Sequence, residues 1–258
     1  MVSALSSSPG TAPRRALPLN GVVASITLRA VFGRKRALLF AILPLILILL
    51  TLVLKAAHPA GGTTWPGHVL GDFGFSVILP LTALIIGTSV LGAEIDDGSI
   101  VHLLATPVRR SSVIVTKFSI AAVLTMGLVA VPELIAGIIA TGSVSKLAIG
   151  LFVGALVGSV VYNALFVMLS VLTTRAIAVG LLYVLIWEVV LGNFVGGARV
   201  LSVEHYSLGV ANSIAHYPSL NAGLSLPTSL IMGALVTVVT LVLATRRLSE
   251  FSLKGDAV

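Results

Sequence analysis

Cysteine is absent from this chain of 258 residues, and charged residues are scarce at 10%. Without cysteine the chain can form neither disulfide bonds nor thiolate metal sites. Hydrophobic residues make up 57% of the sequence, and the mean hydropathy is +1.11. A soluble domain of this length cannot bury so much apolar surface. The composition therefore predicts an integral membrane protein.

Catalytic signatures are missing as well. The sequence contains no GxxxxGK[ST] phosphate loop, no HExxH, no GxSxG and no cysteine nucleophile. Its five histidines fall in predicted loops, so none is placed as a base or metal ligand inside the membrane: His58, His68, His102, His205 and His216. We therefore expect a chain that is not an enzyme and that holds no metal and no cofactor of its own.

Six apolar stretches are long enough to cross a hydrocarbon core, which needs about 20 helical residues. They lie near residues 37–54, 74–92, 118–140, 147–172, 176–195 and 228–245. Short segments of alternating polarity, which are typical of a membrane β-barrel, do not occur. The predicted fold class is an all-α integral membrane protein with six transmembrane helices.

The basic residues are distributed unevenly along this pattern. If the N-terminus is cytoplasmic, three of the 16 Lys and Arg residues fall outside, namely Lys55, Lys146 and Arg199, and the other thirteen fall inside. The positive-inside rule then places both termini in the cytoplasm. The net charge of +7 is explained by topology, so no nucleic-acid partner is expected.

The N-terminal region divides into two parts. Residues 1–19 are rich in Ser, Pro and Ala, which predicts a disordered cytoplasmic tail before a single transmembrane domain over residues 20–258. The segment NGVVASITLRAVFGRKRA, residues 20–37, combines an apolar face with a basic end and predicts an interfacial elbow helix on the inner leaflet. The alternative is a simple extension of the first span. No cleavage pattern follows that span, so we expect it to be retained.

Small residues and short apolar clusters indicate packing. Gly150, Gly154 and Gly158 form a double GxxxG in the fourth span, which permits close helix approach either within one subunit or at a subunit interface. Between the fifth and sixth spans, the clusters 200–201, 208–210 and 214–217 predict short external helices that rest on or dip into the outer leaflet.

Two acids fall within predicted spans. At 1.5 Å per residue, Glu133 lies about 24 Å from Lys117, and Glu188 lies about 20 Å from Arg175. Both distances pass the midplane of a core that is about 30 Å thick. An acid at this depth faces protein or water, so it is either a pathway residue or a structural acid hydrogen-bonded to a neighbouring helix or loop. The candidate pathway residues are Glu133, Trp187, Glu188 and Asn193.

A polar segment, AEIDDGSIVHLLATPVRRSSVIVTKF, joins the second span to the third on the cytoplasmic side. Asp96, Asp97 and Ser99 favour a helix start, because acids and short hydroxyls suit the unpaired N–H groups there. Apolar residues follow from Ile100, and Pro107 interrupts them. The segment predicts a short amphipathic helix that fits a groove on another protein, or alternatively one that floats on the lipid surface.

This segment carries a motif that extends into the third span. Its residues are Glu94, Gly98, Ser99, Leu103, Leu104, Pro107, Arg109, Arg110 and Lys117. The motif resembles the ATPase-coupling region of the ABC-2 type transport permease family, the membrane subunits of bacterial ABC exporters. Six spans, an elbow helix and an external element before the last span are also that family's layout over nearly the whole chain.

The resemblance implies several partners. It implies two copies of a separate ABC ATPase subunit that bind ATP and Mg, and a second permease subunit, most simply a homodimer. It also implies a multi-pass protein of the bacterial inner (plasma) membrane, a coupling helix between spans two and three, and a fifth span that lines the route between subunits.

Three alternatives stay open at this point. One is a proton-coupled secondary transporter that uses Glu133 and Glu188. Another is an intramembrane enzyme, which the lack of a histidine in the spans disfavours. The third is a permease that serves the assembly of a periplasmic metalloenzyme or a surface structure.

Overall fold

The computed structural model describes residues 34–58, 65–96, 110–192, 197–217, 219–220 and 223–255, and the chain in these ranges is helical without strands. The helices are labelled α, and the wider π-helices and one 3-10 helix are labelled η. In chain order they are α2 (Arg34–Ala57), α3 (Trp65–Gly67), η1 (His68–Ile78), α4 (Leu79–Asp96), α6 (Arg110–Thr125), η2 (Met126–Ala130), α7 (Val131–Thr141), α8 (Lys146–Leu172), α9 (Ala176–Tyr183), η3 (Val184–Leu191), η4 (Ala198–Leu201), α11 (Val203–Ala215) and α12 (Leu226–Gly255).

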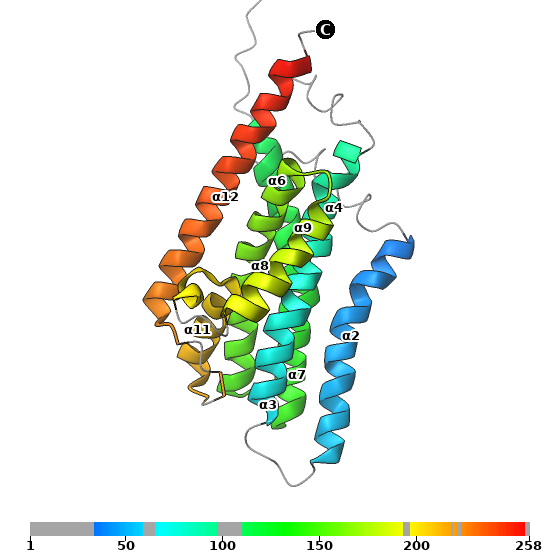
Figure 1. Ribbon diagram of the computed structural model, residues 1–258. Helices are drawn as coiled ribbons and strands as arrows, with labels where there is room; N and C mark the ends of the chain where they lie inside the picture. Colours follow the sequence, from blue (N-terminus) through cyan, green and yellow to red (C-terminus); the bar gives the residue numbers. More distant parts are fainter. Residues whose placement is uncertain are drawn as a thin grey trace, which may run out of the picture.

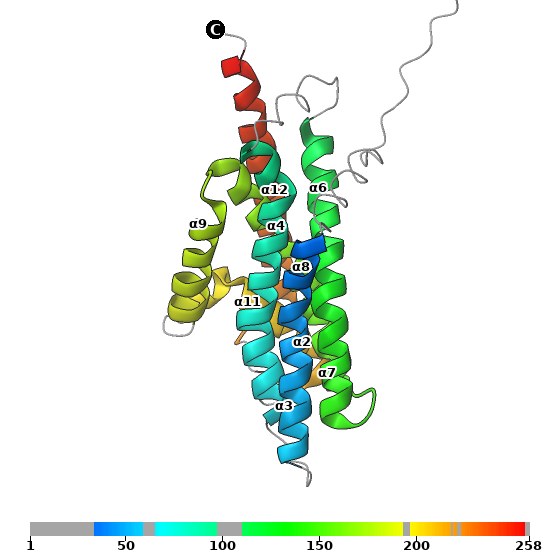
Figure 2. The same ribbon diagram turned by 90° about the vertical axis from the view of Figure 1, so that its right-hand side faces the viewer.

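The long helices form an elongated bundle. Figure 1 shows α2 at one edge, α12 at the opposite edge, and α8 among the helices between them. The C-terminal ends of α4 and α12 lie at one end of the bundle, and α3 and the link between α7 and α8 lie at the other. Turned by 90°, the bundle shows α9 standing to one side of α4 (Figure 2).

Four helical runs in the described ranges are long and apolar enough to cross a membrane: Trp65–Gly92, Arg110–Thr141, Lys146–Leu172 and Leu226–Ser249. Two shorter apolar helices, Ala41–Ala57 and Ala176–Leu191, accompany them. This protein is therefore an all-helical, multi-pass membrane protein. The two shorter helices correspond to the predicted first and fifth spans.

Two of the three π-helices in the described ranges end two residues before a proline. η1 ends at Ile78 before Pro80, and η2 ends at Ala130 before Pro132. Proline has no N–H to donate and its ring crowds the carbonyl four residues earlier. A preceding turn that hydrogen-bonds over five residues accommodates both effects, as in the bond from the Leu79 N–H to the Gly74 carbonyl. At both prolines the helix therefore continues through a widened turn.

Short links at the ends of the bundle are closed by local hydrogen bonds. Gly142 adopts a left-handed conformation with φ 77° and ends α7 by donating its N–H to the Ile138 carbonyl at 2.8 Å. Ser145 then caps α8 by accepting the Ala148 N–H at 3.3 Å. Lys55 Nζ donates to the Ala140 carbonyl at 2.8 Å, which ties the end of α2 to the end of α7.

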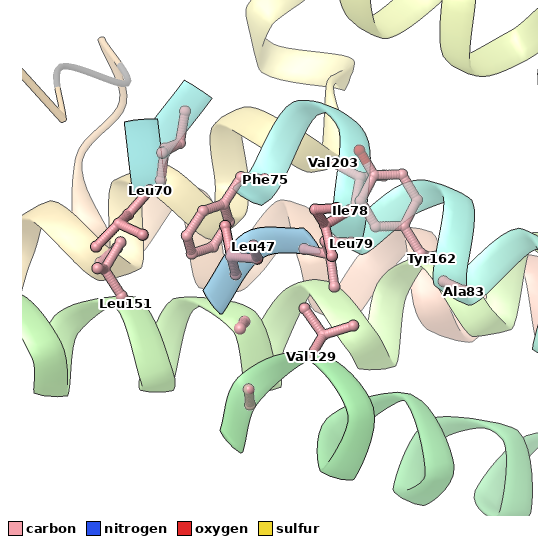
Figure 3. Packing of buried hydrophobic residues seen from close by; sticks show 14 of the residues in the cluster. Leu47, Leu70, Phe75, Ile78, Leu79, Ala83, Val129, Leu151, Tyr162 and Val203 are labelled. Carbon is pink, nitrogen blue, oxygen red and sulfur yellow. The ribbon is translucent and has the colours of Figure 1, made fainter. Parts of the chain in front are cut away.

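Buried apolar side chains form two clusters along the bundle. The larger cluster joins α2, η1, α4, η2, α7, α8 and α11. Figure 3 shows Leu47 of α2 close to Phe75 and Leu79, with Val129 on the helix opposite. The smaller cluster lies toward the end where α4 and α6 meet and includes Ile86, Ile114 and Leu248.

The glycine stripe of α8 receives α11. A β-carbon built on Gly154 would lie 2.6 Å from the Ser207 carbonyl oxygen, and one on Gly150 would lie 2.5 Å from that of Ala211. On Gly158 it would lie 2.3 Å from Ser207 Oγ. The two helices therefore approach backbone to backbone within one chain. Ser207 of α11 lies against Gly154 and Gly158 of α8, whereas the later residue Ala211 lies against the earlier Gly150. The two helices are therefore antiparallel, and the N-terminus of α11 lies deep in the bundle.

Some expectations from the sequence fall differently in the structure. In its described residues, the region after the fifth span contains η4 and α11. Residues Val203 to Ala211 of α11 are all buried, so this helix enters the bundle, which agrees with the expected dip and not with helices that rest on the surface. His205 belongs to this buried helix and His68 is the first residue of η1, so neither lies in a loop as expected. Arg34 to Arg36 form the first turn of α2, whereas the rest of the predicted elbow helix, like the tail at 1–19, lies outside the described residues.

Candidate coupling and pathway sites

The predicted coupling motif lies between α4 and α6. Glu94 falls in the last turn of α4, and Arg110 is the first residue of α6. The other motif residues of the connecting segment lie outside the described residues: Gly98, Ser99, Leu103, Leu104, Pro107 and Arg109. The structure thus describes the two helices that flank this segment, α4 and α6.

Lys117 joins those two helices. It lies two turns into α6, its side chain is fully buried, and its Nζ donates to the Val90 carbonyl of α4 at 2.6 Å. A buried ammonium group needs such partners, because its transfer out of water is costly. Thr88, two residues before Val90 on α4, is also buried and donates to the Leu84 carbonyl at 2.6 Å. Lys117 therefore fixes α6 against α4 where the motif segment leaves the bundle.

Glu188 is fully buried and points into the bundle. Its neighbours on η3, Leu185 and Val189, are 53% and 39% exposed on the outer side of that helix. Tyr183 OH donates to Oε1 of Glu188 at 2.8 Å, and the Ser202 hydroxyl donates to Oε2 in a short hydrogen bond. The carboxylate thus links η3 to the residue that precedes α11.

The backbone of α11 completes the environment of Glu188. The Val203 N–H donates to Oε1 at 3.0 Å, and the Glu204 N–H points at Oε2 at 3.4 Å. These are the first two amides of α11, which otherwise have no partner inside the helix. A negative group at a helix N-terminus is stabilised by both the amides and the helix dipole. Glu188 therefore acts as a cap for α11, supplied by another helix.

Four polar residues that were not among the sequence candidates surround this cap. Ser202 is the N-cap of α11 and contacts His205 Nδ1 at 2.9 Å. Ser76 of η1 donates to Glu204 in a short hydrogen bond. Ser202 followed by Glu204 in the first turn is a helix-start signal that could have located α11 in the sequence.

The α11 side chains next to the cap have shifted proton affinities. Burial raises the pKa of Glu204 to about 7, and the negative charges of Glu188 and Asp72 add to this effect while the Ser76 hydrogen bond opposes it. Burial lowers the pKa of His205 to about 4, with a further contribution from the Arg199 charge. His205 is therefore neutral near pH 7 and accepts or donates a single hydrogen bond at each nitrogen.

Glu133 has a different environment. It is fully buried in α7, and neither carboxyl oxygen has a hydrogen-bond partner among the described residues. A β-carbon built on Gly74 would lie 1.9 Å from Glu133 Oε1, so the absence of a side chain at Gly74 provides the space for this carboxyl group. Glu133 thus contacts η1 and is not part of the Glu188 cluster.

The remaining candidates contribute little to a shared site. Trp187 donates its Nε1–H to the Leu201 carbonyl at 3.1 Å, which holds η3 against η4. Asn193 lies outside the described residues. The structure places Trp187 and Glu188 on one helix and Glu133 on another, against different neighbours. In the described ranges, no group of three or more acids and histidines that could hold a metal ion is found.

Comparison with known protein families identifies the chain. The sequence model of the family described as ABC-2 family transporter protein matches residues 54–251. This protein belongs to the ABC-2 transporter family. The matched range runs from the end of α2 into α12 and covers most of the chain. No curated protein matches the sequence at a significant level.

Membership in this ABC-2 family assigns the general role. The chain is a permease component of an ABC transporter, a transport subunit of the membrane and not itself an ATPase. The resemblance that the coupling motif indicated is thereby confirmed.

Proposed function

We propose that this ABC-2 permease is the pathway-forming subunit of an exporter, acting as a homodimer with two ABC ATPase subunits that bind ATP and Mg. In this proposal each subunit has six spans, with α2 as the first and α9 with η3 as the fifth. An even number of spans keeps both termini on one side of the membrane, and the distribution of Lys and Arg favours the cytoplasmic side for them and for the segment 97–109. The ATPase docks on residues 94–110, and its nucleotide cycle moves this segment.

One observation carries the proposal: the segment joins α4 and α6 where these helices are locked together. The Lys117 bond to the Val90 carbonyl crosses between them, and Ile86 of α4 and Ile114 of α6 belong to one buried apolar cluster. Packed interiors transmit displacement because they are dense and have little space to yield. A force on the segment therefore moves both helices together, which is what ATP-driven transport requires of a coupling element.

The outer faces of α9 and η3 support an apolar or amphipathic substrate. Leu182 of α9 and Leu185 and Ile186 of η3 are 57%, 53% and 48% exposed, whereas Glu188 of η3 faces inward. In a dimer whose pathway is lined by the fifth span, these apolar side chains contact the substrate. A strongly polar substrate would leave this surface unpaired, so the class that fits is one with substantial apolar area.

Docking of the ATPase can be tested by changing Leu103 and Leu104 together to Asp. Two charges in a desolvated contact oppose association, so we expect the variant to insert in the membrane but to lose the co-purifying ATPase and transport. The control changes both residues to Met, which keeps the apolar character and should retain the partner. Co-purification of the ATPase with the double Asp variant at the wild-type level would refute the docking site.

A further inference from the structure

The apolar helix that α9 and η3 form has one narrow buried stripe. Its buried residues are four apart in the sequence: Ala176, Gly180, Val184 and Glu188. Residues with this spacing lie on one face of a helix. The other residues of α9 and η3 are half-buried or exposed. The stripe is therefore the face by which this helix contacts the rest of the bundle.

Apolar residues alone do not fix the rotation of η3 about its own axis. Apart from Trp187 and Glu188, its residues are Val, Leu and Ile on the buried face and on the exposed faces alike. Lipid tails are as apolar as these side chains, so turning one aliphatic face toward the bundle instead of another gains little. In α9 a close contact orients the helix, because a β-carbon built on Gly180 would lie 2.3 Å from Leu84 Cδ1. η3 contains no glycine, so its orientation depends on its polar residues.

Glu188 provides the strongest of these polar contacts. An acid is costly against lipid, so it turns its own side of η3 toward the bundle. Its carboxyl group accepts hydrogen bonds from the Tyr183 and Ser202 hydroxyls and from the N–H groups of Val203 and Glu204. Ser202 and both N–H groups belong to the start of α11. These bonds therefore fix η3 relative to α11 in direction as well as in distance.

α11 is itself held firmly against α8. The backbone carbonyls of Ser207 and Ala211 lie where β-carbons on Gly154 and Gly150 would clash with them, so no side chain separates the two helices. Dense packing of this kind leaves a helix little space to shift. The position of α8 is thus transmitted through α11 and Glu188 to η3.

This arrangement also determines the exposed face of the helix. With Glu188 inward, Leu185 and Val189 point outward, and these two residues are themselves four apart. A turn of η3 by one residue would bring both of them to the buried side. The side chains that face outward would then be different ones.

We propose that Glu188 is a positioning residue of the substrate pathway: its bonds to the start of α11 fix the rotation of η3 and so present Leu182, Leu185 and Ile186 to the substrate. Glu188 itself does not touch the substrate. The inference rests on the proposed export function, in which these aliphatic side chains line the route between two subunits. It differs from a contribution to stability alone, because the acid determines which side chains face the pathway.

The test exchanges two neighbouring residues, Glu188→Val together with Val189→Glu, which keeps the composition of η3. The chain has no cysteine, so a nitroxide attached to Leu185→Cys is a single reporter, and its collisions with oxygen measure exposure to lipid in nanodiscs. Residue 185 lies on the same face as residue 189, so the exchange should turn the reporter inward and remove most of its oxygen accessibility. Glu188→Gln keeps a polar group that can accept hydrogen bonds and should retain the wild-type accessibility.

A nitroxide on Val238→Cys is the matched control, because Val238 is exposed on α12 and far in sequence from the stripe. Its accessibility should be the same in every variant that folds. If the exchange variant does not fold, Ser202→Ala takes its place. This change keeps the acid but removes one of its bonds to the start of α11, so the reporter at residue 185 should become more mobile. A reporter that behaves as in the wild type, in whichever of these variants folds, would overturn the inference.

A separate measurement addresses the pathway between subunits. With Leu185→Cys in both copies of the otherwise wild-type chain, a bifunctional maleimide should join the two copies, and the exchange of residues 188 and 189 should reduce this product. Absence of the crosslink without the exchange would count against the proposed dimer pathway. The nitroxide measurement decides separately whether Glu188 orients η3.

Discussion

Glu133 and Glu188 are both fully buried acids in the described helices, yet their surroundings are opposite. Glu188 accepts hydrogen bonds from two hydroxyl groups and from the first amides of α11. Glu133 has no described hydrogen-bond partner and occupies the space left by Gly74. Depth and burial therefore do not distinguish a structural acid from a functional one. The hydrogen-bond partners of the carboxyl group do. The Glu188 environment is that of a structural cap, whereas an unsatisfied buried acid calls for a separate explanation.

The largest expected effect follows removal of the Glu188 carboxyl group. Glu188→Leu leaves the hydroxyl groups of Ser202 and Tyr183 and the N-terminal amides of α11 without their acceptor. We expect a loss of about 2–4 kcal/mol in the free energy of unfolding, since several buried donors lose their partner at once. Thermal unfolding in detergent measures this loss. Val190→Leu, on the exposed side of η3, is the control and should unfold like the wild type. An unchanged unfolding temperature for Glu188→Leu would remove the distinction between the two acids.

A smaller effect tests the contact between Glu133 and Gly74. Gly74→Ala places a methyl group where the Glu133 carboxyl group lies, which should cost about 1–3 kcal/mol. Glu133→Ala removes the obstacle, so the double variant should lose less stability than the two single changes predict when added. Gly137→Ala is the control, because its β-carbon would lie 2.7 Å from the Ala148 backbone, which Glu133→Ala does not relieve. Additive losses for Gly74→Ala and Glu133→Ala would show that the two residues do not meet.

The smallest effects on stability are expected from glutamine at either acid. Glu188→Gln keeps the size and one acceptor but turns an NH₂ group toward donors, so it should cost about 1 kcal/mol. Glu133→Gln disturbs no described hydrogen bond and should change stability by less than that. Chemical denaturation compares the two variants directly. A larger loss for Glu133→Gln than for Glu188→Gln would reverse the assignment of the structural acid.

Apolar runs located the main helices, although the second and third runs begin at Trp65 and Arg110, earlier than the predicted 74 and 118. The fourth span, predicted at 147–172, is α8 from Lys146 to Leu172, because one long apolar run between a serine cap and a polar link has few alternatives. The π-helices before Pro80 and Pro132 depend on how the neighbouring helices pack, which local sequence does not specify. Local sequence thus determined the elements but not their finer geometry.

The polar cluster could not be predicted because it joins distant parts of the chain. Ser76 and Glu204 are 128 residues apart, and Glu188 and Ser202 meet only because α11 returns along α8. The glycines of α8 predicted a close helix contact, but their spacing does not say which helix fills the groove. The apolar clusters between the fifth and sixth spans indicated helices there, and their mild polarity concealed how deeply α11 is buried. Pairing between elements is the information that a single sequence lacks.

The central claim, that an ATPase docks between α4 and α6, is tested most directly by crosslinking. The chain has no cysteine, so Leu103→Cys introduces a single reactive thiol. Ser143→Cys is the matched control, because Ser143 is exposed in the link between α7 and α8, at the opposite end of the bundle from the segment between α4 and α6. A membrane-permeant thiol-to-lysine crosslinker added to cell membranes should join the protein to an ABC ATPase through residue 103 and not through residue 143. A crosslink at residue 143, or none to an ATPase at residue 103, would contradict the account.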